Sequence, residues 1–302
     1  RFYMINISLD QNWIMKDRSW DRFIPSSVPG DLYSDLLNSG KIADPYYRDN
    51  ELEALKLAEH EYEYQTAFSV DETVLERDRV LLRFDGIDTL ADLYLNGTCL
   101  GSVDNMHRTW EFDVKEFLRE GDNVLSVEFH SPTEYIRERY EKRRLDGTSD
   151  AMRGFPYLRK AHCMFGWDWG PRLPGVGLWR PVSLVAYDTA RIDSTYVTQK
   201  HTDGTVEIST RVELQSASAE SFVYGAENVL LLKAEPELTK LSVKAEVYDP
   251  EGALVATGDG VTPVRIEKPR LWWPAGYGEQ PLYTVKVSLL CGEKVLDTWE
   301  HR

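Results

Sequence analysis

The stretch Lys160-Ala-His-Cys-Met-Phe-Gly-Trp-Asp-Trp-Gly-Pro-Arg-Leu-Pro-Gly-Val-Gly-Leu-Trp-Arg-Pro-Val-Ser-Leu184 decides how the rest of the chain is interpreted. It holds three tryptophans, one aspartate, four glycines and three prolines between two segments typical of β-strands. Glycine and proline at this density predict a loop of fixed, unusual backbone geometry. A loop that only connects two strands is usually small and polar, whereas this one carries large indoles.

Two interpretations of this loop are open. In the first, Trp167, Asp168 and Trp169 form a sugar contact, because a pyranose stacks its C–H face on an indole while a carboxylate accepts hydrogen bonds from hydroxyls. In the second, Trp167 and Trp169 are buried plugs, and Asp168 caps a turn. Composition alone does not separate the two.

The overall composition excludes several classes of partner. The 302 residues suffice for two domains, and formal net charge is −15 from 35 basic and 50 acidic residues. This acidity argues against nucleic acid, and against an anionic membrane surface, since both require a basic face. Cys99, Cys163 and Cys291 are too far apart for a disulfide framework or a zinc site. With no signal peptide in the chain, they favour a reducing, cytoplasmic compartment. No metal or cofactor is expected.

The loop also carries a family resemblance. Arg159-Lys-Ala-His-Cys-Met-Phe-Gly-Trp-Asp-Trp-Gly-Pro171, followed by Gly177-Leu-Trp-Arg-Pro-Val182, resembles the N-terminal domain of β-mannosidases in glycoside hydrolase family 2. The resemblance implies that the turn reaches the active site of a following barrel domain and contacts mannose. Trp167, Asp168 and Trp169 are then substrate-binding residues, Trp167 by packing and Asp168 by hydrogen bonds. Arg172 is a candidate for orienting Asp168.

Short alternating segments predict an all-β first domain over residues 1–190. Asn96-Gly97 between two such segments predicts a tight hairpin. The run Phe84-Asp-Gly-Ile-Asp-Thr-Leu-Ala-Asp-Leu-Tyr-Leu-Asn-Gly97 resembles the jelly-roll sugar-binding domain that opens family 2 enzymes. Strands are expected at residues 8–14, 62–70, 79–84, 91–95, 98–103, 108–114, 123–130 and 178–187, and helices at 31–38, with Asp31 as N-cap, and at 133–144.

Residues 191–302 are expected to form a second domain, an immunoglobulin-like β-sandwich that is incomplete at its C-terminal end. Its strands are predicted at residues 194–199, 205–214, 241–248, 264–267 and 283–290, with a type I turn at Asp249-Pro-Glu-Gly252. The segment Arg270-Leu-Trp-Trp-Pro-Ala-Gly-Tyr-Gly-Glu-Gln-Pro-Leu-Tyr283 also resembles family 2. Two interpretations of Trp272 and Trp273 are open, contact with a ligand and structural packing of that loop, and packing is favoured. Residues 216–235 show no pattern.

Catalytic carboxylates are not expected in this chain. A retaining glycosidase needs two of them roughly 5 Å apart, and in this family both are glutamates of a (β/α)8 barrel that the sequence lacks. Asn50-Glu51 matches the dipeptide of the family's acid/base, but we place it in a turn region and reject it. We therefore predict an inactive N-terminal fragment of an exo-glycosidase acting on β-mannoside oligosaccharides, with its own barrel domain as partner. The alternatives are a stand-alone carbohydrate-binding module and a family 2 glycosidase of other specificity, such as an exo-glucosaminidase.

Overall fold

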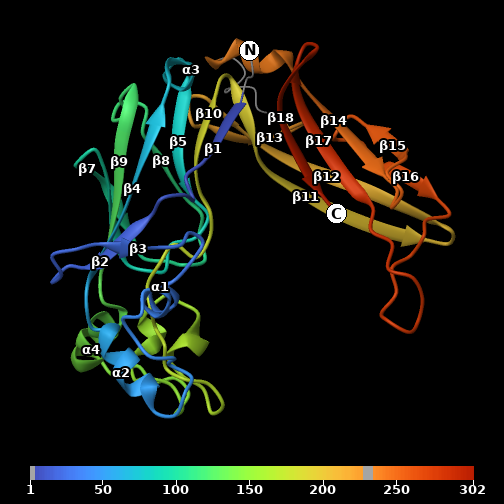
Figure 1. The fold of residues 1–302 in the computed structure, drawn as a ribbon. Helices are drawn as coiled ribbons and strands as arrows, with labels where there is room; N and C mark the ends of the chain where they lie inside the picture. The colour runs from blue at the N-terminus through green and yellow to red at the C-terminus, as the bar shows by residue number, and fades with distance from the viewer. Residues whose placement is uncertain (1–3, 227–233) are drawn as a thin grey trace. The chain divides into compact units, whose positions relative to one another are not determined.

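The computed structural model describes residues 4–226 and 234–302, and the chain divides into two compact units (Figure 1). The N-terminal unit comprises Asn6–Glu76 and Val80–Val185. The C-terminal unit comprises Ala186–Arg302 with short segments that include Met4, Ile5 and Arg77–Arg79. The domain limit between residues 190 and 191 stays a prediction.

Two antiparallel sheets build the N-terminal unit. One has six strands in the order β3-β2-β4-β9-β6-β7, and the other has four in the order β1-β10-β5-β8. Along β4, β6 and β9 every second side chain is more deeply buried, as packing of one sheet face on another requires. The strands are β1 Met4–Ser8, β2 Ile14–Asp17, β3 Ile24–Pro25, β4 Tyr62–Val70, β5 Arg79–Phe84, β6 Ala91–Leu95, β7 Thr98–Val103, β8 Trp110–Asp113, β9 Gly121–Phe129 and β10 Val182–Tyr187.

The strand with the clearest alternation is β4, which the sequence predicts with the same bounds. Tyr62 and Tyr64 are buried on its inner face, and Tyr64 meets Phe129 of β9 edge to face with ring centroids 5.1 Å apart. The Asn96-Gly97 hairpin is also confirmed. Both residues have positive φ, 52° and 82°, and they join β6 to β7. A type I′ turn requires this pair of angles.

The first strand was expected at residues 8–14, and this prediction is wrong. β1 ends at Ser8, and β2 begins at Ile14. Between them Asn12 has a φ of 60°, which breaks any extended run. Trp13 is only 2% exposed and donates from its indole nitrogen to the carbonyl of Leu9 at 2.6 Å. The aromatic plug therefore exists, but it lies in a loop between strands.

The helices of the N-terminal unit include α1 Leu32–Asn38, α2 Asn50–Leu57, α3 Glu72–Leu75 and α4 Pro132–Lys142, with short 3-10 turns η1 Phe155–Tyr157 and η2 His162–Phe165. Figure 1 shows α1, α2 and α4 together at one end of this unit. Asp31 caps α1 as predicted, because its carboxylate accepts from the backbone of Tyr33 and Ser34. Helix α2 was not predicted, and Glu51 lies in its first turn rather than in a loop.

The C-terminal unit is a second β-sandwich. One sheet has the order β11-β12-β13 with β16 also paired to β12, and the other runs β15-β14-β17-β18. Val212, Leu214, Val247, Val287 and Leu289 are buried between them. The all-β fold class is thereby confirmed, and the described residues contain no closed barrel. The elements are β11 Ala190–Thr202, β12 Thr205–Ser216, β13 Ser221–Val223, η3 Pro236–Lys240, β14 Leu241–Tyr248, β15 Leu254–Gly258, β16 Val264–Glu267, β17 Thr284–Cys291 and β18 Lys294–His301.

Two other predicted features of this unit can be compared with the structure. The Asp249–Gly252 turn is confirmed, since the amide of Gly252 donates to the carbonyl of Asp249 at 2.9 Å. Trp272 and Trp273 were expected to pack, yet they keep 54% and 48% of their surface exposed. The unpatterned segment at residues 216–235 contains β13, and its residues 227–233 lie outside the described part of the chain.

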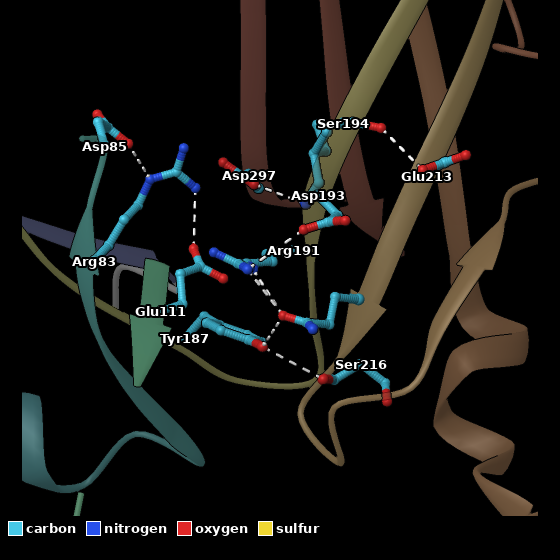
Figure 2. A network of polar contacts seen from close by, with 12 residues as sticks. Arg83, Asp85, Glu111, Tyr187, Arg191, Asp193, Ser194, Glu213, Ser216 and Asp297 are labelled. Carbon is cyan, nitrogen blue, oxygen red and sulfur yellow. Dashed lines mark hydrogen bonds and ion pairs between the residues drawn. The ribbon is translucent and has the colours of Figure 1, made fainter. Parts of the chain in front are cut away.

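Polar side chains tie neighbouring strands together within each unit (Figure 2). In the N-terminal unit, Arg83 of β5 pairs with Asp85 at 2.8 Å and with Glu111 of β8 at 3.0 Å. In the C-terminal unit, the nearly buried guanidinium of Arg191 donates to the side-chain oxygen of Gln215 at 2.9 Å, which ties β11 to β12. Each of these contacts links or flanks neighbouring strands of one sheet.

Candidate functional site

Trp167, Asp168 and Trp169 lie in one tight turn. The backbones of Trp167 and Gly170 exchange two hydrogen bonds of 3.4 and 3.3 Å, so Asp168 and Trp169 occupy the tip. The turn is preceded by Gly166, whose φ is 110°. A Cβ at that position would lie 2.9 Å from the side chain of Arg172, in a backbone conformation that other residues rarely adopt. Glycine is therefore required for the chain to enter the turn.

The side chains of this turn project into solvent. Trp167 is 43% exposed and Trp169 is 82% exposed, with ring centroids 5.4 Å apart and planes inclined at 48°. Neither indole is a buried plug. Within the described residues, the exposed carboxylate of Asp168 makes no hydrogen bond or ion pair, and so it does not cap the turn.

The predicted orienting role of Arg172 finds no support in its contacts. Across residues 4–226 and 234–302, no ion pair joins Arg172 to Asp168. The backbone amide of Arg172 instead donates to the carboxylate of Glu51 on α2 at 2.8 Å. Glu51 therefore fastens the outgoing arm of the loop to a helix.

The base of the loop is held by a buried ion pair. The ammonium of Lys160, completely buried, donates to the carboxylate of Asp88 and to the carbonyl of Gly175 at 2.8 Å. Burial lowers the pKa of Lys160, and the adjacent Asp88 opposes that shift. Because Lys160 precedes the turn and Gly175 follows it, one side chain fixes both arms of the loop.

Backbone pairing closes the same base. Asp88 and Gly177 exchange two hydrogen bonds of 2.9 Å, and the amide of Leu173 donates to the carbonyl of Met164 at 3.0 Å. Gly177 also packs against the residues that begin α1, where a Cβ would lie 2.8 Å from the carbonyl of Gly30. Beneath the loop, Phe165 is fully buried in a small apolar cluster. The exposed turn is therefore supported by a buried base, in which the ion pair and the backbone hydrogen bonds described above hold the two arms of the loop together.

A pocket of about 600 Å³ lies between the turn and α1. Its residues all belong to the N-terminal unit. They are Asp31, Tyr33, Ser34 and Leu37 from the start and body of α1, Pro45 and Tyr46 from the loop before α2, and Cys163, Met164, Trp167, Trp169, Gly170, Pro171 and Leu173 from the Trp-Asp-Trp loop. The structure therefore brings Trp167 and Trp169 into one wall, while Asp168 stands outside the lining.

Sequence reasoning missed the buried pair and the far wall of the pocket. Lys160 and Asp88 are 72 residues apart, and no spacing rule connects them. Tyr46 was not among the predicted site residues. Lys160 directly follows Arg159, and Asp88 lies between Asp85 and Asp92, so neither charge stood out in the sequence. Only the fold shows that they are buried, where charges need a partner. No described group of three or more His, Cys, Asp or Glu residues is arranged to bind a metal.

Comparison with known proteins gives a consistent family signal. The sequence profile of the glycosyl hydrolase 2 galactose-binding domain-like family matches residues 13–180, and that of glycosyl hydrolases family 2 matches residues 190–302. The chain is 28% identical to a β-mannosidase of Capra hircus and 31% identical to β-mannosidase B of Thermothelomyces thermophilus, over 94% and 98% of its length. A crystal structure of β-D-mannosidase from Dictyoglomus thermophilum superposes with a TM-score of 0.79 at 30% identity, over 95% of this chain.

The matches cover only part of these relatives. The chain spans 33% and 34% of the two curated β-mannosidases and 34% of the crystallised one. Separately, none of the helices in the described ranges is long and apolar enough to cross a membrane.

Proposed function

Because this chain belongs to glycosyl hydrolase family 2, we propose that it forms the N-terminal portion of a retaining exo-glycosidase that releases β-linked mannose from non-reducing ends. The observation that carries the proposal is the exposed Trp167-Asp168-Trp169 turn on its buried ionic base. An exposed carboxylate between two indoles offers what a sugar needs, namely apolar faces and a charged acceptor for hydroxyls.

The residues have separate roles in this proposal. Trp167 and Trp169 pack against the C–H faces of the substrate, and Asp168 accepts hydrogen bonds from mannose hydroxyls. Lys160 and Asp88 hold the turn in position without touching the substrate. The acid/base and the nucleophile are supplied by a barrel domain of the full-length protein, against which the loop docks. The chain's own contribution is to complete the mannose subsite and to exclude water from it.

The experiment that tests this function compares the full-length protein with the isolated chain. We expect the full-length protein to hydrolyse aryl β-mannosides in preference to β-galactosides and β-glucosaminides, with β-mannose as the first product seen by NMR. The isolated chain should be inactive on all three, because it lacks both carboxylates. Preference for another sugar, or turnover by the repurified isolated chain, would contradict the proposal. Sugar binding by a full-length protein without any hydrolysis would indicate a carbohydrate-binding module instead.

A further inference from the structure

The pocket beside the Trp-Asp-Trp turn extends well beyond the tip that carries Asp168. Tyr46 reaches it from the loop before α2 and is 74% exposed, and Leu37 reaches it from α1 and is 41% exposed. The volume of about 600 Å³ falls within the range of small-molecule pockets. A single sugar at the tip leaves this space unused.

The residues that line this pocket favour an uncharged sugar ring. Four aromatic side chains contribute apolar faces, and the described lining residues include no Lys, Arg or His; the aromatics are Tyr33, Tyr46, Trp167 and Trp169. The one carboxylate among the described lining residues is Asp31, whose oxygens accept from the amide of Tyr33 at 2.9 Å and from the hydroxyl of Ser34 at 2.7 Å. A uronic acid or a phosphate would meet this carboxylate with no cation to balance it. A neutral sugar stacks on the aromatic rings without such a cost.

The position of the pocket relative to Asp168 fixes which sugar it receives. Asp168 stands at the tip and does not line the pocket. If Asp168 holds the terminal mannose, then a second sugar that continues across the indoles must be bonded to that mannose. An enzyme that removes the non-reducing terminal residue has nothing on the other side of it. The second sugar is therefore on the leaving-group side of the scissile bond.

We propose that this pocket is a subsite for the neutral sugar of the leaving group, with Tyr46 and Trp169 as its stacking platforms. The inference rests on the proposed function and specifies its substrate class: oligosaccharides of β-mannose are preferred to mannosides with small leaving groups. Tyr46 sets that preference, because it comes from a segment remote from the turn and contacts only the second sugar.

The test uses the full-length protein and two substrates, β-1,4-mannotriose and methyl β-mannoside. Tyr46→Ala should lower the ratio of their kcat/KM values about 2- to 10-fold, the size expected for one lost aromatic stacking contact. The matched control is Tyr47→Ala, since Tyr47 is an adjacent tyrosine, 58% exposed, that does not line the pocket. The control should leave the ratio unchanged.

Each other outcome is decisive. An equal fall in kcat/KM on both substrates, or a lower Tm for Tyr46→Ala, would identify Tyr46 as part of the fold or of a domain interface, and would overturn the inference. An unchanged ratio would also overturn it, while leaving the proposed function intact. A wild-type protein that hydrolyses neither substrate would refute the proposed function itself, and the subsite with it.

Discussion

Two aromatic loops, one in each unit, look alike in sequence and differ in how they are held. Residues 160–177 and 270–283 are both rich in Trp, Gly and Pro, and both expose indoles: Trp169 is 82% exposed and Trp272 is 54% exposed. The first loop is fixed by the buried pair of Lys160 and Asp88. The second is held by Arg270, itself 46% exposed, which pairs with Glu251 and Glu279 on the surface.

This difference in support indicates which of the two loops can hold a ligand-contacting side chain in a fixed position. Buried polar groups must keep their partners, because an unpaired charge in a low dielectric is costly, and so the base of the first loop has one arrangement. Exposed ion pairs exchange readily with water and contribute little. Precise positioning of a catalytic or binding group needs a base of the first kind. The comparison can be tested by substituting Lys160, which supports the first loop, and Arg270, which supports the second.

The largest expected effect comes from Lys160→Met in the isolated chain. The substitution leaves the Asp88 carboxylate buried without its partner, and removing one member of a buried pair costs about 3–5 kcal/mol of unfolding free energy. Urea denaturation followed by tryptophan fluorescence measures this value. The matched control, Arg270→Met, is expected to be nearly neutral. If Lys160→Met lowers the free energy of unfolding by less than Arg270→Met does, the buried pair does not anchor the loop.

The second effect is a pH dependence of stability that comes from a buried carboxyl group on α1. Asp35 of α1 is 2% exposed and accepts hydrogen bonds from Ser26 and Ser27 at 2.7 and 2.9 Å. Burial raises the pKa of Asp35 to about 6, against the opposing effect of these hydrogen bonds. The folded state therefore keeps this proton to a higher pH than the unfolded state, whose pKa is 3.8. The stabilising contribution is full below pH 3.8 and is lost as pH rises to about 6.

Asp35→Asn isolates this contribution, because asparagine keeps the side-chain oxygen and cannot ionise. The variant should gain stability relative to wild type between pH 4 and pH 7, by up to about 3 kcal/mol. Urea midpoints across that range measure the difference, since all other groups titrate alike in both proteins. A difference that does not change with pH would show that Asp35 is ionised in the folded state as readily as in the unfolded chain.

The third effect concerns function rather than folding. In the full-length protein, Asp168→Ala should lower kcat/KM on a β-mannoside roughly 10- to 150-fold, the cost of about 1.5–3 kcal/mol for a hydrogen bond to a charged group. If the contact strengthens in the transition state, kcat falls as KM rises. The Tm should stay the same, because Asp168 is exposed and caps nothing. A nearly unchanged kcat/KM together with a lower Tm would instead show that Asp168 stabilises the turn and does not contact the substrate.

Sequence patterns predicted the regular strands well, because burial of one face imposes a period of two. β4, β5, β6, β7, β14 and β16 have the predicted bounds. The pattern failed where an apolar residue is buried outside any strand, as with Trp13. It also missed α2, where the amphipathic signal is weak and only Ala54 is buried.

The candidate site was predicted only in part, for a different reason. Residues adjacent in sequence, such as Trp167 and Trp169, can be recognised together. The supports of the loop come from elsewhere: Asp88 follows β5, and Glu51 lies on α2. Sequence spacing carries no information about contacts made through the folding of distant segments. The anchoring pair and Tyr46 therefore required the structure.

The smallest expected effect is that of Arg270→Met in the C-terminal unit. Its guanidinium lies 3.0 Å from the carboxylate of Glu279 and also pairs with Glu251, but all three side chains are largely in solvent. Exposed ion pairs of this kind typically contribute about 0–1 kcal/mol, since water solvates the separated charges and side-chain entropy opposes the contact. The free energy of unfolding should therefore fall by less than about 1 kcal/mol, and the difference should vanish in 1 M salt, where screening acts over about 3 Å. Chemical denaturation at low and high salt checks both statements. A loss as large as that of Lys160→Met, or one that persists in high salt, would mean that the second loop is anchored as firmly as the first, and the distinction between a positioned loop and a surface loop would fail.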